Sequence, residues 1–376
     1  MKILLATGIY PPDAGGPATY TRALARALAS SGEHQVQVVA YGDADTVDEK
    51  DGYPVQRIGR NRDVLTRYWN FFLAVAKRAK NVDVVYLQGP VSEGLPGMLG
   101  AMFVGKPTVM KVVGDYAWEV YAGNGGTDLL DEFLTKVHAG KIGWIEKIER
   151  WTAKRAKELI VPSRYLKTVV EKWGVASNAI DIIYNAVEPL PAGGRRDDLR
   201  RSFGVAEQRV ILTSVRAVPW KGVDFLLNLM PDLPPDVFLA VAGDGPSLDG
   251  WKKQAEELGV SSRVRFMGRL DRAVLADWYR ASDLFVLASG YEGFPHVVAE
   301  AASVGLPSFV SDRGGNPETQ ILFGDQCVRI LPYRNREAWM HALKNVWPVH
   351  AQPKSDVLDF EQMIANVIAK LRKNVL

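Results

Sequence analysis

Residues 1–32, MKILLATGIYPPDAGGPATYTRALARALASSG, decide the fold class. Residues 2–7 form a short apolar run without alternation, which is typical of a strand buried on both faces. The pair Gly15-Gly16 follows, and apolar residues then recur at helical spacing as far as Gly32. This succession of strand, loop and helix is the unit from which parallel sheets covered by helices are built.

The same unit recurs along the whole chain. Strand-like runs are separated by helical stretches, and we predict strands at residues 2–7, 35–40, 82–87, 108–113, 158–162, 210–215, 237–242, 264–267, 283–288 and 307–311. Between the two sets lies PLPAGGRRDD (189–198), which is rich in proline, glycine and charge and is typical of a linker. The pattern predicts an α/β protein with two doubly wound Rossmann-like domains facing across a cleft.

We therefore expect an N-terminal domain over residues 1–188 and a C-terminal domain over residues 189–355. Residues 356–376 form a separate C-terminal segment, in which 359–376 have the pattern of an amphipathic helix. Packing of this helix back towards the N-terminal domain is left open.

Composition excludes several classes of protein. The 376 residues carry 46 basic and 43 acidic side chains, a net charge of +3, whereas a dedicated nucleic-acid binder is usually far more basic. No apolar run of about 18 residues is present, so we expect no transmembrane helix. The single cysteine and five scattered histidines offer no disulfide and no zinc-type cluster. These features favour a cytoplasmic protein.

Two loops have the composition of phosphate-binding sites. Gly15-Gly16 precedes a helix, whose first N–H groups and dipole favour an anion. Arg216 and Lys221 follow the predicted strand 210–215, at the edge where open α/β sheets bind ligands. A guanidinium fork and an ammonium group together can neutralise a diphosphate. The alternatives are an ordinary turn and two solvated cations.

A third segment, EGFPHVVAE, follows the predicted strand 283–288. It runs from Glu292 to Glu300, and a helix that begins near His296 would present further N–H groups to an anion. Glu300 then lies about one turn inside that helix, where its carboxylate can accept hydrogen bonds from a ribose diol. The alternative is a helix with an acidic first turn, which is common in proteins.

Together these segments resemble a known family. The motifs are GG after the first strand, VPSRYL, IYNAVE, VRAVPWKG, VAGDGP and EGFPHVVAE. In this combination and order they resemble the retaining glycosyltransferases of the GT-B fold, closest to glycosyltransferase family 4. The resemblance covers nearly the whole chain. It implies transfer of a hexose from a nucleotide-diphosphate sugar, bound by the C-terminal domain, to the hydroxyl of an acceptor held by the N-terminal domain.

The resemblance also implies roles for individual residues. Arg216 and Lys221 would bind the donor diphosphate, Glu292 would position the sugar, and Glu300 would bind the ribose. Arg269 and Leu270 would meet the base, and Gly16 would close over the diphosphate from the other domain. The predicted donor-binding set is Gly15, Gly16, Arg216, Lys221, Gly243, Arg269, Leu270, Glu292, Gly293, Phe294, Pro295, His296, Val297 and Glu300.

One segment departs from the family pattern. Many relatives have a histidine at the end of an N-domain strand, but residues 112–119 read VVGDYAWE and contain none. Asp115 is the nearest polar candidate, and we include it with Arg216, Lys221 and Glu292 among the predicted catalytic residues. Its structural alternative is a helix cap or a loop residue.

A metal is not expected. Asp43-Ala-Asp45 spells the D-x-D of metal-dependent glycosyltransferases, but it lies in an acidic stretch, YGDADTVDE, that fits a solvated loop. Arg216 and Lys221 can neutralise a diphosphate without a metal ion, and we predict no cofactor. Front-face attack by the acceptor hydroxyl, with retained anomeric configuration, is the mechanism that we favour.

The sequence says less about the donor, the acceptor and a contact with the membrane. We expect a UDP- or GDP-linked sugar and an acceptor that is a sugar, a glycolipid or a polyprenyl-linked carrier in cell-surface glycan synthesis. The basic stretch 136–157 fits an ordinary surface helix, and its alternative is a docking surface at the inner face of a membrane.

Other classes of function stay open to different degrees. A nucleotide-sugar epimerase would need acid and base groups that residues 114–119 do not obviously supply. A dinucleotide oxidoreductase would need G-x-G-x-x-G after the first strand, where this chain has GIYPPDAGG. A silent nucleotide-sugar sensor would share the binding residues and differ only in turnover.

Overall fold

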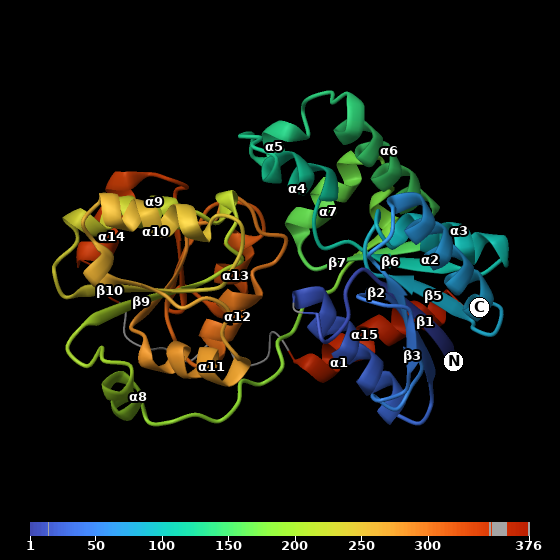
Figure 1. The fold of residues 1–376 in the computed structure, drawn as a ribbon, viewed down its shortest axis with the longest axis horizontal. Coiled ribbons are helices and arrows are strands. Elements are labelled where there is room, and N and C mark those ends of the chain that lie inside the picture. The colour runs from blue at the N-terminus through green and yellow to red at the C-terminus, as the bar shows by residue number, and fades with distance from the viewer. Residues whose placement is uncertain (14, 346, 348–358, 375–376) are drawn as a thin grey trace. The chain divides into compact units, whose positions relative to one another are not determined.

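The computed structural model describes residues 1–13, 15–345, 347 and 359–374, which form two compact units (Figure 1). The first unit comprises Met1–Tyr121, Leu130–Tyr184 and Glu361–Leu376, and the second comprises Ala122–Leu129 and Asn185–Phe360. The main division thus falls between Tyr184 and Asn185, a few residues before the boundary expected at 188/189. The boundary expected at 355/356 lies outside the described residues.

The first unit is built on one sheet. Within the described residues it has eight strands in the order β3-β4-β2-β1-β5-β6-β7-β8, and every neighbouring pair is parallel except β3 with β4. The strands are β1 Lys2–Thr7, β2 Gln35–Gly42, β3 Thr46–Asp48, β4 Val55–Gly59, β5 Val84–Leu87, β6 Thr108–Lys111, β7 Glu158–Val161 and β8 Ile180–Ile182. The strand order reverses at β1, between β2 and β5, which defines a doubly wound sheet.

Helices connect these strands and cover both faces of the sheet. They are α1 Gly16–Ser30, α2 Val64–Ala79, α3 Gly94–Phe103, α4 Tyr116–Gly123, α5 Leu130–Phe133, α6 Gly140–Arg155, α7 Arg164–Lys172 and α15 Phe360–Lys373, with the 3₁₀ turn η1 Ser177–Ala179. Strands β1, β5, β6 and β7 are almost wholly buried, as expected of strands covered on both faces.

The second unit repeats the design with six described strands, all parallel, in the order β11-β10-β9-β12-β13-β14. They are β9 Arg209–Ser214, β10 Val237–Ala242, β11 Val264–Phe266, β12 Leu284–Leu287, β13 Ser308–Ser311 and β14 Val328–Leu331. The order reverses at β9, between β10 and β12. The two doubly wound sheets, parallel except at the β3–β4 pair, confirm the predicted α/β class with two Rossmann-like domains.

The helices of the second unit are α8 Arg196–Ser202, α9 Val223–Leu229, α10 Leu248–Glu257, α11 Arg272–Ala281, α12 His296–Ser303, α13 Asn316–Phe323 and α14 Arg336–Asn345, with the 3₁₀ turns η2 Pro219–Lys221, η3 Met230–Asp232 and η4 Ser261–Arg263. Their apolar faces and the strands form one core, in which Trp339 and Tyr279 are fully buried. Helix α8 corrects one expectation, because it begins inside the predicted linker.

Four strands were not expected from the sequence: β3, β4, β8 and β14. Each is short and contains exposed or half-buried positions, so none forms a continuous apolar run. All four lie at or next to an edge of their sheet, where a strand needs fewer apolar neighbours. No helix in the described part of the chain is long and apolar enough to span a bilayer.

The C-terminal helix α15 packs within the first unit. Its Leu371 is fully buried, and Lys370 Nζ lies 2.6 Å from an Asp181 carboxylate oxygen. Beyond the helix, Asn374 Nδ2 donates to the buried Glu158 carboxylate over 2.6 Å. The far end of the chain therefore completes the core and the polar contacts of the N-terminal sheet.

We predict that Leu371→Ala lowers the free energy of unfolding by about 2–4 kcal/mol, because it leaves a cavity beneath α15. Arg372→Ala on the same helix is the control: the Arg372–Glu33 pair is exposed, so its loss should change stability by less than about 1 kcal/mol. Urea denaturation of both variants measures the two values. Equal effects would mean that α15 is not anchored by its apolar face.

Candidate functional site

The predicted donor-binding residues of the second unit lie on loops at one edge of its sheet and on helix α12, which follows one of these loops. These loops leave the carboxyl ends of β9, β10, β11 and β12, which are neighbours in the strand order β11-β10-β9-β12. Parallel strands bring all their carboxyl ends to the same edge, and ligands of open α/β sheets bind there at the point where the order reverses. In this sheet that point is the β9–β12 pair.

An ion pair joins the loops that follow β9 and β12. Lys221 Nζ lies 2.7 Å from Glu292 Oε1, and the same oxygen accepts a hydrogen bond from Ser289 Oγ at 2.8 Å. Only 17% of the Lys221 side chain and 11% of the Glu292 side chain are exposed. Partial burial strengthens such a pair relative to one in water. The structure thus brings together two of the four predicted catalytic residues.

The predicted cation at the start of the β9 loop has a different environment. Arg216 is exposed, and within the described part of the chain no ion pair of its guanidinium is found. Its backbone is fixed, since its carbonyl oxygen accepts a hydrogen bond from the Val218 N–H at 2.8 Å. After β11, Arg269 is also exposed and Leu270 is half-buried. Arg216 therefore offers an accessible positive charge on the same loop as Lys221.

Glycines allow these loops to approach one another closely. Gly222 has φ +72°, and a Cβ atom there would lie 2.1 Å from the Ala288 carbonyl oxygen at the end of β12. Gly243 has φ +123°, and its Cβ atom would lie 1.8 Å from the Val215 carbonyl oxygen after β9. Both positions combine a conformation that favours glycine with a lack of room for a side chain.

The loop from Glu292 to Pro295 is held between its neighbours. The Glu292 carbonyl oxygen accepts a hydrogen bond from the Gly315 N–H at 2.7 Å, and the Trp220 carbonyl oxygen accepts one from the Gly290 N–H at 2.7 Å. Gly293, Phe294 and Pro295 are buried. The loop is therefore anchored to the segments that follow both β9 and β13.

Helix α12 begins at His296, as expected. His296 Nε2 lies 3.0 Å from Asn185 Nδ2, and both His296 and Val297 are half-buried. Glu300 lies in the second turn, where a carboxylate oxygen accepts a hydrogen bond from the Tyr279 hydroxyl at 2.9 Å. Burial raises the pKa of Glu300 above its ordinary value. Glu300 is therefore held in place by α11, with its second oxygen available as an acceptor.

Gly15 and Gly16 belong to the first unit and open α1. Both are exposed, and Gly15 caps the helix with φ +149°. No acidic residue lies in the first turn of α1. The first N–H groups of the helix therefore follow a glycine loop, the arrangement that the sequence predicts for an anion.

The placement of Asp115 favours its structural alternative. One carboxylate oxygen accepts a hydrogen bond from the Trp118 N–H at 2.8 Å at the start of α4, and the other accepts one from the Trp173 indole at 3.2 Å. The residue is 1% exposed, and burial raises its pKa to about 6. Because both oxygens serve internal donors, Asp115 has the geometry of a helix cap, and we leave it out of the proposed transfer machinery.

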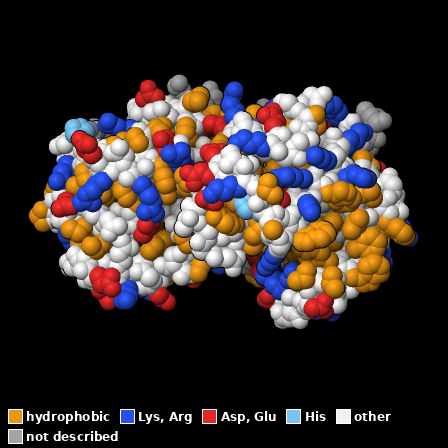
Figure 2. Space-filling view, turned by 90° about the horizontal axis from the view of Figure 1, so that it is seen from above, with side chains coloured by type: hydrophobic (Ala, Val, Ile, Leu, Met, Phe, Trp, Pro, Cys, Tyr) orange, Lys and Arg blue, Asp and Glu red, His pale blue; other side chains and the backbone are white. Residues whose placement is uncertain are grey.

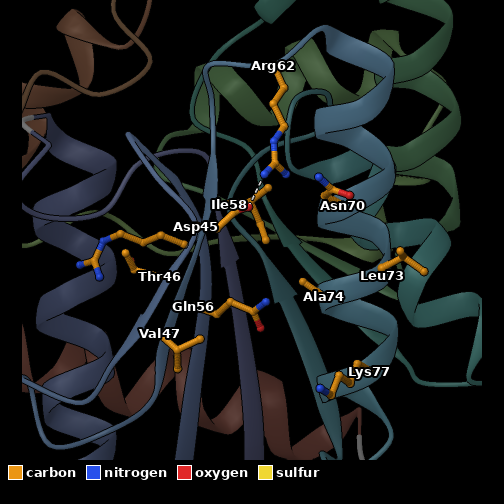
Figure 3. Close-up of a pocket in the computed structure, with 11 residues that line it drawn as sticks. Asp45, Thr46, Val47, Gln56, Ile58, Arg62, Asn70, Leu73, Ala74 and Lys77 are labelled. Atoms are coloured by element: carbon orange, nitrogen blue, oxygen red, sulfur yellow. Dashed lines mark hydrogen bonds and ion pairs between the residues drawn. The ribbon is translucent and has the colours of Figure 1, made fainter.

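The D-x-D segment has internal partners as well. Asp45 accepts a hydrogen bond from the Gly59 N–H at 2.7 Å and forms an ion pair with Arg62. A pocket of about 440 Å³ lies beside this pair, between the β3–β4 edge and α2 (Figure 3). It contains none of the predicted donor-binding residues. In the described part of the chain no group of three or more metal-ligating side chains occurs.

A second pocket contains Glu93, which the sequence did not single out, together with Tyr116 and Glu119 of the segment 112–119 discussed above. It measures about 220 Å³ and lies at the carboxyl ends of β1, β5 and β6, where the order of the first sheet reverses. Glu93 lines it together with Tyr116 and Glu119. Burial raises the pKa of Glu93. The segment GPVSEG after β5 could have indicated this pocket, because a glycine-containing loop with a carboxylate follows a predicted strand here, as it does at Glu292.

Two family models match the chain. The model described as Glycosyltransferase Family 4 matches residues 14–189, and the model described as Glycosyl transferases group 1 matches residues 195–343. The first match lies in the N-terminal half, and the second covers the strands and loops of the candidate donor site. Together the two matches cover most of the chain, one in each of its two halves.

Relatives of known name and structure agree with these matches. A GDP-mannose-dependent alpha-(1-6)-phosphatidylinositol monomannoside mannosyltransferase of Mycolicibacterium smegmatis is 25% identical over 84% of this chain and 82% of its own. An alpha-monoglucosyldiacylglycerol synthase of Streptococcus pneumoniae is 25% identical over 89% of this chain and 75% of its own. The crystal structure of Anabaena HepE with UDP-glucose has a TM-score of 0.78, with 19% identity, over 99% of this chain and 100% of its own.

Fold and family matches together define a glycosyltransferase with two Rossmann-like domains of the GT-B fold. Within that class, the chain belongs to the glycosyltransferases of family 4 type.

The close approach of the β9 and β12 loops is testable at Gly222. Gly222→Ala combines an unfavourable φ with the clash against Ala288, whereas Gly204→Ala has a similar φ of +68° and nothing within 4 Å. The control should cost about 1–2 kcal/mol of stability, from the backbone alone. We predict that Gly222→Ala costs more and also weakens nucleotide binding. Urea denaturation measures the loss of stability, and calorimetric titration measures the nucleotide affinity. Equal stability and equal affinity in the two variants would contradict the packing described.

Proposed function

We propose that the chain transfers a hexose from a nucleoside-diphosphate sugar to an acceptor hydroxyl, with retention of the anomeric configuration and without a metal ion. The observation that carries this proposal is the partly buried Lys221–Glu292 pair at the carboxyl edge of the second sheet, with the accessible Arg216 on the same loop as Lys221. A cationic site for a diphosphate and a carboxylate for sugar hydroxyls are thereby combined at one place.

The donor diphosphate would bind to Arg216, Lys221 and the N–H groups at the start of α12. Negative charge develops on the departing diphosphate in the transition state, and groups already fixed in position stabilise it without reorganising. Lys221 is fixed by Glu292 and by the η2 turn, and the Lys221 N–H donates to the Val218 carbonyl oxygen at 3.1 Å.

Glu292 would position the donor sugar. One of its oxygens is already bound by Lys221 and Ser289, which leaves the other to accept hydrogen bonds from sugar hydroxyls. A carboxylate held this way is suited to orientation and not to covalent attack. We therefore favour attack by the acceptor hydroxyl on the same face that the diphosphate leaves, with the phosphate accepting the proton of the acceptor.

The nucleoside would lie along the loops after β10 and β11. Glu300 would accept hydrogen bonds from the ribose diol, while Arg269 and Leu270 would border the base next to Gly243. A uridine or a guanosine nucleotide is supported by the relatives, since one is named GDP-mannose-dependent and another was crystallised with UDP-glucose.

The acceptor would be a lipid or a lipid-linked sugar. This part of the proposal is supported by the mycolicibacterial and pneumococcal relatives, whose names specify a phosphatidylinositol mannoside and a diacylglycerol glycolipid. The pocket at the carboxyl ends of β1, β5 and β6 is the place that we propose for the acceptor hydroxyl. Glu93, Tyr116 and Glu119 line it, and these side chains can exchange hydrogen bonds with a polyol.

Replacing Arg216 or Lys221 with alanine should reduce both nucleotide affinity and sugar transfer. Loss of one charge-assisted hydrogen bond costs about 1.5–3 kcal/mol, which corresponds to about ten- to a hundredfold. The measurement is calorimetric titration with UDP and GDP, followed by transfer to a lipid extract with the matching labelled sugar nucleotide. The matched controls are Arg201→Ala and Lys252→Ala, which remove exposed cations from α8 and α10.

Wild-type affinity and rate in both Arg216→Ala and Lys221→Ala would contradict the assignment of the donor site. Similar losses in the control variants would also contradict it, because net charge and not position would then explain the effect. Circular dichroism of each variant establishes that the fold is retained.

Transfer should persist in the presence of excess EDTA, because the cationic side chains take the place of a metal. Asp43→Asn with Asp45→Asn should likewise leave the rate within about twofold, since Asp45 has only internal partners. Complete loss of transfer with EDTA, restored by Mg²⁺ or Mn²⁺, would instead favour the D-x-D segment as a metal site.

A further inference from the structure

Helices α2 and α3 of the first unit carry a connected group of apolar side chains at the surface, which we call the α2–α3 patch. Leu65 is 82% exposed, Trp69 is 60% exposed and Phe103 is 74% exposed. The whole patch consists of Leu65, Trp69, Phe72, Leu73, Leu99, Met102 and Phe103. Single exposed apolar residues are common, but a contiguous group of this kind marks an interaction site.

The patch is continuous from one helix to the other. On α2, Leu65, Trp69 and Leu73 follow one another at a spacing of four residues and so share one face. The Trp69 ring stacks on Phe72 with 5.2 Å between centroids, and Phe72 meets the edge of Phe103 at 5.9 Å. The aromatic rings thus form a row that crosses from α2 to α3.

A glycine allows the two helices to approach closely enough for this contact. A Cβ atom on Gly100 of α3 would lie 2.9 Å from the Phe72 carbonyl oxygen on α2. The helix backbones therefore pack directly, and the bulky side chains next to the contact are directed outwards. The position of the patch therefore depends on the close packing of α2 against α3.

Positive charge accompanies the apolar surface. Residues 64–106 contain five basic residues and two acidic ones. Of the two acidic residues, Glu93 is buried, and the Asp83 carboxylate accepts a hydrogen bond from the Lys2 N–H at 2.7 Å. Figure 2 shows hydrophobic side chains gathered on the side that carries α2 and α3, with Lys and Arg side chains next to them. Lys77 and Leu73 line the same pocket as Arg62 (Figure 3).

We propose that the α2–α3 patch docks the protein on the surface of an anionic lipid bilayer. Trp69, Phe103 and Leu65 would enter the boundary between headgroups and acyl chains, where aromatic side chains are favoured. Lys77 and Lys80 would contact lipid phosphates, each adding to the attraction. The inference rests on the proposed function in one respect, since a transferase with a membrane-lipid acceptor must work at a bilayer.

Two other arrangements fit the observations less well. In a symmetric dimer the patch would meet its own copy, and the excess of basic over acidic residues would place like charges together. The basic helix α6 has one strongly exposed apolar side chain, Trp144 at 67%, while its Ile145 is buried. The α2–α3 patch combines several exposed apolar side chains with cations, whereas α6 places its cations over Trp144 and the half-buried Trp151.

The test is sedimentation of the full-length protein with phosphatidylcholine vesicles, with and without phosphatidylglycerol. Trp69→Ser with Phe103→Ser should weaken binding to the anionic vesicles by at least about tenfold, because two side chains lose their burial in the interface. Trp144→Ser is the matched control, since it removes a tryptophan of similar exposure from α6. It should change binding by less than about twofold.

The contribution of charge is measured separately. Lys77→Glu with Lys80→Glu should reduce binding to anionic vesicles and remove most of its dependence on salt. Lys147→Glu with Lys154→Glu is the matched pair on α6, where both lysines are exposed. A larger effect of the α6 pair would overturn the proposal.

Three further results would also overturn the proposal. The first is that the wild type does not bind anionic vesicles, and the second is that Trp144→Ser weakens vesicle binding as much as Trp69→Ser with Phe103→Ser does. The third is that the protein does not bind vesicles but self-associates, and that Trp69→Ser with Phe103→Ser abolishes this self-association. The last would identify an interface between copies. Nucleotide titration of every variant separates this proposal from the proposed function. If the patch variants lose vesicle binding as expected but the wild type binds no nucleotide, the result would support membrane docking and contradict only the proposed sugar transfer.

Discussion

The candidate donor site depends on the ion pair between Lys221 and Glu292. Taking an ammonium group and a carboxylate out of water is costly, so a pair in this environment requires good geometry and further hydrogen bonds. Ser289 supplies one of these, and the 2.7 Å separation supplies the geometry. The pair joins the β9 loop to the β12 loop across the point where the strand order reverses. It thereby fixes one cation and one carboxylate relative to each other before any ligand binds.

Glycine makes that arrangement sterically feasible. At Gly222 and Gly243 the backbone of one loop contacts the carbonyl group of a neighbouring segment directly, and any side chain would force the loops apart. The Gly315 N–H adds a hydrogen bond to the Glu292 carbonyl oxygen from the loop after β13. Fixed loops are useful to a transferase, because transition-state stabilisation is greatest where charged groups need not reorganise during reaction.

Much of this could be predicted from the sequence because it depends on local patterns. Apolar runs specified the central strands, and the segments around Lys221 and Glu292 identified the loops that meet. Short edge strands such as β3 and β14 lack such a run, so they could not be found. The partners of Asp115 were also beyond reach, since Trp173 is distant in sequence and only the folded unit brings its indole to that carboxylate. Likewise, the α2–α3 patch depends on a tertiary contact at Gly100, whereas the sequence drew attention to the basic residues of α6.

The central claim is that the loops after β9, β10, β11 and β12 bind a nucleoside diphosphate, and amide hydrogen exchange tests it most directly. The protein would be exchanged alone and with saturating UDP, GDP or ADP, in the presence of EDTA. We predict that one nucleotide slows exchange in peptides covering residues 215–222, 243–246, 268–270 and 289–300. Tight binding of a nucleotide with protection confined to other segments, or no protection by any of the three, would contradict the account.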